Sequence, residues 1–248
     1  DVKMLVSKMV RYTHHRGPDA ACVSDLYDGQ ICLGHNRLSI LDLDKRSNQP
    51  YMFENLRMVY NGEVYNYIEI RSKLEFHGYH FTTESDTEVI IKAFHHWGEK
   101  CFEMFNGMWA IAIYDLRKKR MYLCRDQLGI KPLYYYFNKG SFIFASEINQ
   151  LNTCLNLKNY NSEQIAIYLA LGYENHNHQT FYTEINEVPP STILIFNTVN
   201  QAITTGLSFK IQKRNKPLNF QDAVDEFDEI FERSVKLRQR SDVPITAC

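Results

Sequence analysis

No apolar stretch in this 248-residue sequence is longer than one strand or one short helix, so its core has to be assembled from many small elements. The longest unbroken stretches cover residues 108–114 and 165–171, well short of the roughly 18 residues that a membrane-spanning helix needs. Turn-forming residues separate such runs, as at Asn48-Gln49-Pro50. Because hydrophobic residues make up 44% of the chain and aromatic residues 13%, we expect a packed globular core and exclude intrinsic disorder.

The chain carries almost no net charge. Its 28 Lys and Arg residues nearly balance 29 Asp and Glu residues, and the two signs are interleaved. This composition offers no electrostatic argument for a nucleic-acid partner or an anionic membrane surface. The first residues do not resemble a signal peptide, because polar and charged residues interrupt any apolar core (Lys3, Ser7, Lys8, Arg11). We therefore expect a cytoplasmic protein with neither a membrane nor a nucleic-acid partner.

Neither the cysteines nor the histidines form a recognisable disulfide or metal pattern. The six cysteines include no Cys-x-x-Cys pair and are interpreted as reduced thiols. Adjacent residues such as His14-His15 and His95-His96 would point about 100° apart on a helix, so neither pair chelates one ion. His176 and His178 make only a weak His-x-His pattern, and we expect no metal site. Both glycine-rich phosphate-binding motifs are missing, so no nucleotide cofactor is expected within this chain.

Helical and strand-like patterns follow one another without a regular order. Apolar stripes of helical spacing predict helices over residues 2–13, 87–97, 162–171 and 220–239. Ser85 and Glu88 fit a capping box, and Ser162 fits the cap of the third helix. Short apolar runs predict strands over residues 31–35, 38–43, 56–60, 108–115, 120–125, 134–137, 142–145 and 192–196. This mixture indicates an α+β fold with antiparallel sheets rather than the regular alternation of a Rossmann fold.

The composition changes near residue 210. Residues 210–216 are polar and basic and are followed by Pro217, which suits a linker, so we place a domain boundary between 205 and 218. The last residues, from 241 on, have the pattern of a buried strand. There is no initiator Met, and the first helical pattern begins at once. We expect the sequence to be part of a longer polypeptide.

Three candidate site features each allow two interpretations. Asn61-Gly62 is the strongest short signal for a hairpin turn, but a side-chain amide beside a glycine N–H can also form an oxyanion hole. Arg37 is either a surface charge or a bidentate clamp for a carboxylate. Asp86 either complements the dipole of the helix it opens or binds an ammonium group. Taken singly, these residues leave both interpretations open.

Several motifs occur in a fixed order and are more specific together. They are Arg16-Gly17-Pro18-Asp19, Arg37-Leu38-Ser39-Ile40, Tyr60-Asn61-Gly62-Glu63-Val64-Tyr65-Asn66, Ser85-Asp86-Thr87-Glu88-Val89-Ile90, Asn106-Gly107-Met108-Trp109-Ala110, Arg125-Asp126-Gln127-Leu128-Gly129-Ile130-Lys131-Pro132-Leu133-Tyr134-Tyr135 and Ala145-Ser146-Glu147-Ile148. This series resembles the glutaminase domain of glutamine-hydrolysing asparagine synthetases, which are class II, Ntn-type glutamine amidotransferases. The resemblance runs from residue 2 to about 210, and residues 237–244 resemble the entry to the synthetase domain.

The resemblance implies a fold and a set of partners. The fold is a four-layer αββα sandwich of two antiparallel sheets, as in Ntn hydrolases. Residues 1–208 would form the glutaminase domain, and residues 209–248 the linker, first helix and first strand of an α/β, ATP-dependent synthetase domain. The partners would be glutamine and the protein's own synthetase domain, which receives the ammonia. ATP and Mg²⁺ would bind only in that second domain, and the family resemblance leaves a homodimer open.

The resemblance also implies a glutamine pocket formed by Arg37, Leu38, Ile40, Asn61, Gly62, Glu63 and Asp86. Arg37 would pair with the α-carboxylate of glutamine, and the backbone of Leu38 and Ile40 would line the pocket. Glu63 and Asp86 would face its α-ammonium group. The amide of Asn61 and the N–H of Gly62 would stabilise the oxyanion. The family motifs give no role to Asp126, Lys131 or Glu147.

The family's mechanism needs an N-terminal cysteine, which its members carry on a Cys-Gly-Ile strand ahead of the first helix. This chain begins with Asp1, and Cys22 and Cys32 lie beyond the first predicted helix. We therefore expect the chain as given to lack the opening strand of its core and to be inactive. Two rival functions stay open: an amidotransferase with another acceptor, such as a sugar acid, and a non-catalytic scaffold domain, as in β-lactam-synthetase-like relatives.

Overall fold

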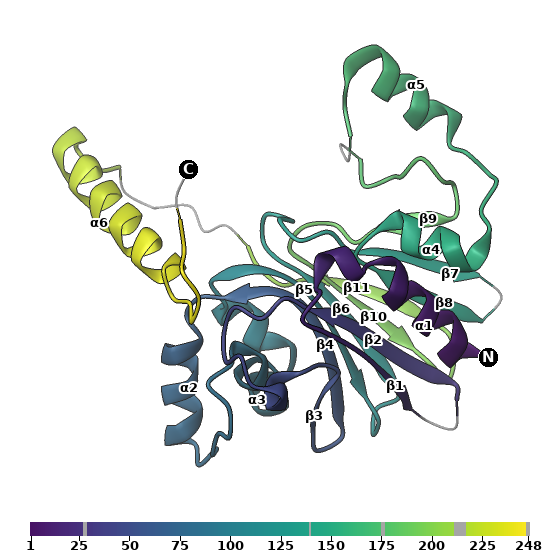
Figure 1. Cartoon of the computed structure of the whole chain (residues 1–248). Helices are drawn as coiled ribbons and strands as arrows, with labels where there is room; N and C mark the ends of the chain where they lie inside the picture. The colour runs from purple at the N-terminus through teal and green to yellow at the C-terminus, as the bar shows by residue number, and fades with distance from the viewer. Residues whose placement is uncertain (27–28, 139, 175–176, 211–216, 247–248) are drawn as a thin grey trace.

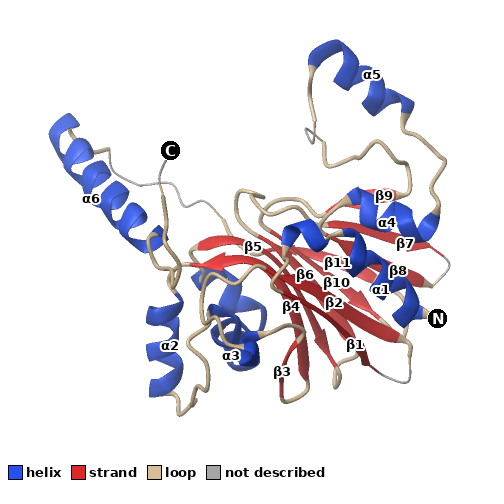
Figure 2. Ribbon diagram, viewed as in Figure 1, coloured by secondary structure: helices blue, strands red, loops and turns tan. Residues whose placement is uncertain are grey.

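The protein is built in four layers, helix on strand on strand on helix (Figures 1 and 2). The computed structural model describes residues 1–248 except 27–28, 139, 175–176, 211–216 and 247–248. Helices α2 (Tyr67–Phe76) and α3 (Asp86–Trp97) cover the outer face of a large sheet. On the opposite side of the molecule, α1 (Val2–Tyr12) and α4 (Ile148–Leu155) cover a second layer of strands. This arrangement confirms the predicted αββα sandwich with antiparallel sheets.

The large sheet has the strand order β11-β10-β6-β5-β4-β3, and every pair in it is antiparallel. Its strands are β3 (Tyr51–Phe53), β4 (Leu56–Val64), β5 (Gly107–Asp115), β6 (Arg120–Arg125), β10 (Thr192–Asn197) and β11 (Ile203–Leu207). Both faces of β5 are buried. Trp109, Ile111 and Ile113 pack toward α2 and α3, while Ala110 and Ala112 pack toward the second strand layer. A strand covered on both faces reads as a continuous apolar run, which is why the sequence predicted it so clearly.

The second strand layer consists of two separate sheets. One pairs β1 (Ala20–Leu26) with β2 (Ile31–Arg37), and the other has the order β8-β7-β9. The strands of this second sheet are β7 (Tyr134–Asn138), β8 (Ser141–Ala145) and β9 (Ile185–Glu187). In the part of the chain that the structure describes, no strand pairs with the second edge of β2 or of β8.

The four predicted helices are present, with corrections at their caps. They correspond to α1, α3, α5 (Ser162–Leu171) and α6 (Phe220–Arg238). Ser85 caps α3 as predicted, since its hydroxyl accepts from the N–H of Thr87 at 3.1 Å. The predicted capping box is wrong, because the carboxylate of Glu88 instead accepts from the N–H of Thr83 at 2.7 Å and pairs with Lys92. For α5 the cap is Asn161, one residue before the predicted Ser162.

The predicted strand over residues 38–43 is wrong, since these residues form an irregular loop. The loop wraps around the guanidinium group of Arg37, which donates to the carbonyl groups of Leu41, Asp42 and Asp44. Carbonyl groups that turn toward one side chain in this way do not point sideways to a neighbouring strand, as a strand ladder requires. Other elements carried too weak a pattern and were not predicted: α2, α4, β1, β3, β9, β11 and the 3₁₀ helices η1 (His14–Arg16), η2 (Lys45–Ser47) and η3 (Gly98–Met104).

The end of the described chain differs from the rest. Helix α6 extends away from the strand layers (Figure 1), and the apolar residues of its predicted stripe are exposed, with Phe227 64% and Phe231 60% accessible. The predicted linker lies largely outside the described residues. Residues 241–246 form bends and irregular chain instead of the predicted strand, and no described strand pairs with them. No helix in the described part of the chain is long and apolar enough to cross a membrane.

Candidate active site

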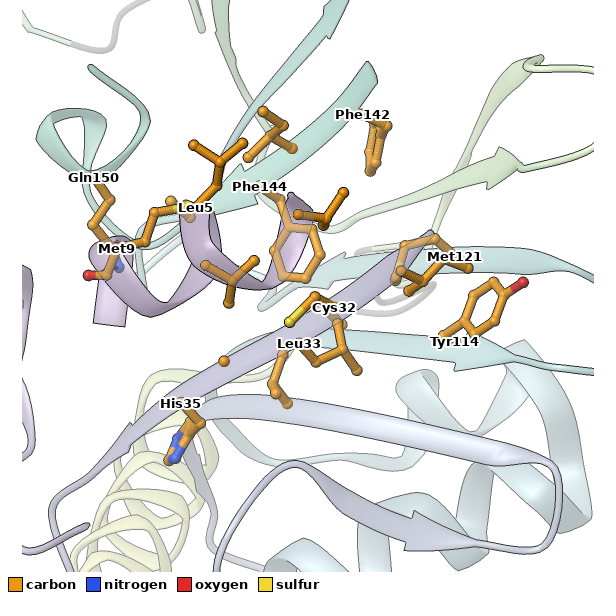
Figure 3. A pocket seen from close by; sticks show the side chains of 18 of the residues that line it. Leu5, Met9, Cys32, Leu33, His35, Tyr114, Met121, Phe142, Phe144 and Gln150 are labelled. Carbon is orange, nitrogen blue, oxygen red and sulfur yellow. Dashed lines mark hydrogen bonds between the residues drawn. The ribbon is translucent and has the colours of Figure 1, made fainter. Parts of the chain in front are cut away.

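A cavity of about 800 Å³ lies between the two strand layers, under α1 (Figure 3). Consecutive residues of two strands line it, 30–36 around β2 and 140–146 around β8. Because successive side chains of a strand point to opposite faces, a run of consecutive residues means that the cavity meets the edges of β2 and β8 rather than one face. No described strand pairs with either of these edges. The cavity is therefore a slot bordered by two open strand edges.

Asn61 lies inside β4 and not in a turn. It pairs with Ala110 of β5, and the ladder continues to Val64, so the hairpin interpretation of Asn61-Gly62 is wrong. Its side chain lines the cavity. The amide nitrogen is buried and has no hydrogen-bond partner among the described residues. A buried donor without a partner is uncommon and costs about 1–3 kcal/mol, so this amide needs an explanation.

The N–H of Gly62 points to the open edge of β4. Gly62 lies opposite Trp109 of β5. The N–H and carbonyl groups of Trp109 bond to Asp126, on the side of β5 away from β4, so Gly62 and Trp109 form a non-hydrogen-bonded pair. The flanking N–H groups at the same edge confirm the direction: Tyr60 donates to Gln49 Oε1 at 2.5 Å and Val64 to Asp86 Oδ2 at 3.0 Å. Asn61 and Gly62 thus place two donors on one short stretch of strand.

No residue other than glycine fits at position 62. Its φ of +149° is disfavoured for other residues, and a Cβ atom there would lie 2.0 Å from the carbonyl oxygen of Met108. Gly107 on β5 is crowded in the same way, with the carbonyl oxygen of Glu63 2.0 Å from its would-be Cβ atom. The two strands therefore approach each other closely around the predicted oxyanion hole.

Asp86 and Glu63 form an acidic pair beside this strand. Asp86 opens α3 and is buried, and its carboxylate accepts from the hydroxyl of Tyr60 at 2.9 Å as well as from Val64. Burial raises the pKa of Asp86, although these hydrogen bonds oppose the effect. Burial and the nearby charge of Asp86 also raise the pKa of Glu63, while Lys131 lowers it. A cation placed between the two carboxylates would relieve both effects.

Arg37, at the end of β2, is buried and fully engaged by the following loop. Its two terminal nitrogens donate to the carbonyl groups of Leu41, Asp42 and Asp44 and to the side-chain oxygen of Asn48, in the last two cases at 2.7 and 2.8 Å. All four acceptors are uncharged oxygens. A buried cation without an anionic partner is costly, so this guanidinium group still suits an anion that replaces one of the backbone acceptors.

The structure divides the predicted site residues into two groups. Asn61 lines the cavity, whereas the others (Arg37, Leu38, Ile40, Gly62, Glu63 and Asp86) lie outside its lining. The side chain of Leu38 is 57% exposed, and the carbonyl oxygen of Ile40 accepts from the N–H of Asp242 at 3.0 Å. Both groups meet along β4, because Asp86 bonds to Tyr60 and Val64 on either side of Asn61 and Gly62.

His35 is a cavity residue that the sequence did not single out. Its Nε2 donates to the carbonyl oxygen of Tyr60 at 3.0 Å, so Nδ1 is left as an acceptor, and this atom is buried without a partner among the described residues. Burial lowers the pKa of His35 to about 4, with the charge of Arg37 acting in the same direction. The histidine is therefore neutral at pH 7. Its only sequence signal was a polar residue within a strand pattern.

Three of the described cysteines are poor nucleophiles. The thiols of Cys22, Cys32, Cys101, Cys124 and Cys154 are free, as predicted. Burial raises the pKa of Cys124 to about 12 and that of Cys101 well above its usual value. Cys32 lines the cavity, but burial and Asp25 raise its pKa. Figure 3 shows Cys32 pointing toward α1 and His35 to the opposite side of β2, so the thiol faces away from β4.

The residues without a predicted role hold loops in place. Asp126 accepts from the N–H groups of Leu128, Ile130 and Lys131 at 2.9–3.0 Å and so shapes the turn after β6. Glu147 pairs with Arg16 at 3.1 Å and joins the end of α1 to the start of α4. Among the described residues, no three His, Cys, Asp or Glu side chains are placed to hold a metal ion.

Comparison with known proteins agrees with this geometry. The family model described as glutamine amidotransferase domain matches residues 1–206. The chain belongs to this family. A solved structure of glutamine phosphoribosylpyrophosphate amidotransferase from B. subtilis has a TM-score of 0.61 and 18% identity, covering 86% of this chain and 48% of that one. At this identity it shows the fold alone, and it agrees with the four-layer sandwich.

Several curated relatives cover nearly all of this amidotransferase chain. The putative asparagine synthetase [glutamine-hydrolyzing] 2 of Methanocaldococcus jannaschii is 31% identical over 99% of this chain and 51% of its own length. Asparagine synthetase [glutamine-hydrolyzing] 1 of Bacillus subtilis is 32% identical over 99% of this chain and 38% of its own length. The chain thus spans about half or less of the relatives that it matches.

Proposed function

We propose that this chain binds glutamine and supports its hydrolysis to glutamate and ammonia, for the ATP-dependent conversion of aspartate to asparagine by the whole protein. The observation that carries the proposal is the buried, unpartnered amide of Asn61, next to the outward-facing N–H of Gly62. A donor for which the described residues provide no acceptor, beside a second donor on the same strand, is what an oxyanion hole requires. The family match supplies the substrate class.

In the proposed reaction, a cysteine thiolate attacks the carboxamide carbon of glutamine. The tetrahedral oxyanion accepts from Asn61 Nδ2 and the N–H of Gly62. The C–N bond then breaks, the nitrogen takes up a proton, and ammonia leaves a thioester behind. Water hydrolyses the thioester to glutamate and regenerates the thiol.

The charged residues would fix the orientation of glutamine. Its α-carboxylate would take the place of a backbone acceptor on Arg37, whose buried charge has only neutral acceptors. Its α-ammonium group would bind near Glu63 and Asp86, where burial raises both carboxyl pKa values. Glutamine carries an α-carboxylate for Arg37 and an α-ammonium group for the two carboxylates, so it matches both ends of the proposed site.

The nucleophile would arrive on a strand seated in the slot between β2 and β8. Neighbouring strands lie about 4.8 Å apart, and a strand in the slot would join the β1-β2 pair to the β8-β7-β9 sheet. One end of such a strand lies near Asn61, which lines the same cavity. Burial raises the pKa of Cys32, Cys101 and Cys124 and so disfavours their thiolates, and we propose that the chain without this strand is inactive.

A glutaminase assay on three proteins tests the proposal. The chain carrying an N-terminal strand that begins with cysteine should release glutamate and ammonia from glutamine. The same protein with alanine in place of that cysteine, and the chain without the strand, should not. Equal activity of the bare chain would overturn the proposed nucleophile and point to an internal thiol such as Cys32.

The acceptor of the ammonia rests on the relatives. Those that cover nearly the whole chain bear the name asparagine synthetase, which favours aspartate over a sugar acid and an active domain over a scaffold. The test is glutamine- and ATP-dependent amidation of aspartate by the whole protein, with a sugar acid as the competing substrate. Formation of asparagine is the expected result.

A further inference from the structure

Arg240 and Asp242, which follow α6 in the chain, bind the two loops that border the proposed glutamine pocket. Asp242 donates its N–H to the carbonyl oxygen of Ile40 at 3.0 Å, and its carboxylate accepts from the N–H of Asp42 at 2.7 Å. Arg240 forms a two-pronged ion pair with Glu69 at 2.6 and 2.7 Å and donates to the carbonyl oxygen of Tyr65 at 2.6 Å. Ile40 follows β2, and Tyr65 follows β4.

The first of these contacts leads directly to Arg37. Asp42 is buried, has a φ of +46°, and accepts from the N–H of Glu84 at 2.8 Å and from Arg46 at 3.2 Å. Its carbonyl group in turn accepts from Arg37. A non-glycine residue in this conformation is strained by about 1 kcal/mol or more and is retained only where its surroundings hold it. The hydrogen bond to Asp242 is one of the contacts that keep Asp42 in this conformation.

We infer that Arg240 and Asp242 form a clasp that positions the loop of residues 38–48, and with it Arg37, for glutamine binding. The inference rests on the proposed function for its effect on glutamine, but not for the contacts themselves. Neither residue touches the reacting atoms, so both are positioning residues. Since α6 precedes the clasp and extends from the body (Figure 1), the clasp would pass a displacement of α6 on to the loop of residues 38–48.

Amide hydrogen exchange and glutaminase kinetics test the clasp together. Asp242→Ala should raise the exchange of residues 38–48 in this chain at least tenfold. In the chain that carries the N-terminal strand beginning with cysteine (the strand-restored chain), Asp242→Ala should raise the KM for glutamine about 5- to 50-fold and leave kcat within about twofold. Asp242→Asn keeps an acceptor oxygen for the N–H of Asp42 and should restore both quantities to near the wild-type values. Asp228→Ala, on the exposed face of α6, is the matched control and should change neither.

The outcomes separate the clasp from the proposed function. Unchanged exchange of residues 38–48 in Asp242→Ala would overturn the clasp, whatever the activity. An Asn variant that behaves like the Ala variant would overturn the role of the acceptor oxygen. If Asp242→Ala does not fold, Arg240→Gln tests the other contact: it should raise the exchange of the residues near Tyr65 and Glu69, and unchanged exchange there would overturn the clasp. If the strand-restored chain without further substitutions has no glutaminase activity, the proposed function is overturned. The exchange of residues 38–48 then still tests the clasp.

Discussion

Asn61 is the residue at which a local pattern and the tertiary structure disagree most. The dipeptide Asn-Gly favours a hairpin turn, but here β4 continues through both residues because β5 pairs with them. Glycine at position 62 is required by the close approach of Met108 and not by a turn. The same two residues therefore present their donors from a rigid strand, which holds an oxyanion hole more firmly than a loop does.

Asn61→Asp is expected to abolish most of the activity while the fold persists. The substitution replaces an amide donor by a carboxylate beside the place where negative charge develops, and loss of one oxyanion donor alone costs on the order of 10²–10³ in kcat. Steady-state glutaminase kinetics of the strand-restored chain measure the loss, and its melting temperature serves as the control. A folded variant with most of the wild-type turnover would contradict the oxyanion role.

His35 is expected to make stability depend on pH. Its folded pKa of about 4 lies below the ordinary value of 6.5, so below pH 6.5 the unfolded state takes up a proton that the folded state does not. Stability is then unaffected above pH 6.5 and is lost as the pH falls toward 4. At about 1.4 kcal/mol per pKa unit, the loss at pH 4.5 is on the order of 2 kcal/mol.

Denaturant unfolding of the wild type and of His35→Gln at pH 7.5 and pH 4.5 isolates this contribution. Both proteins share all other titrating groups, and Gln keeps an N–H donor for the carbonyl group of Tyr60. The wild type should lose about 2 kcal/mol more than the variant between the two pH values. Equal losses would mean that His35 titrates normally in the folded protein.

At the scale of elements, the contact between β4 and β5 is the tightest constraint near the site. Gly62→Ala should destabilise the chain by about 3 kcal/mol or more, because the new Cβ atom would meet backbone that cannot move without opening the ladder. Gly206→Ala, on β11 with nothing near its would-be Cβ atom, should change stability by less than about 1 kcal/mol. Comparable denaturation midpoints for the two variants would show that the strands can separate locally.

At the scale of the whole molecule, the gap between β2 and β8 divides a layer that would otherwise be one sheet. A strand added at the N-terminus should raise the melting temperature by roughly 5–10 °C, since each kcal/mol corresponds to about 2–4 °C for a domain of this size. A matched extension with proline at alternate positions removes ladder donors and should have little effect. Equal melting temperatures for the two extensions would argue against a strand in the slot.

The sequence by itself determined the elements whose signals are local. The capped helix at Asp86–Trp97 and the doubly buried strand at Gly107–Asp115 follow from periodicity and a capping residue, and the four-layer class was implied by the family resemblance of the ordered motifs. Those signals need only neighbours along the chain. The family resemblance rested on the same motifs, which is why it named the residues of β4 and α3 before their geometry was known.

Tertiary structure alone decided the features that depend on distant partners. The loop at 38–48 is not a strand, because its carbonyl groups accept from Arg37 and the N–H of Asp42 donates to Asp242. Asp242 is 200 residues away from Asp42 in sequence. His35 loses its charge because β4 and Arg37 lie against it. The slot exists because two strand edges face each other without a partner in the described chain. Hydrogen bonds and burial between segments far apart in sequence leave no periodic pattern, so no local analysis could find them.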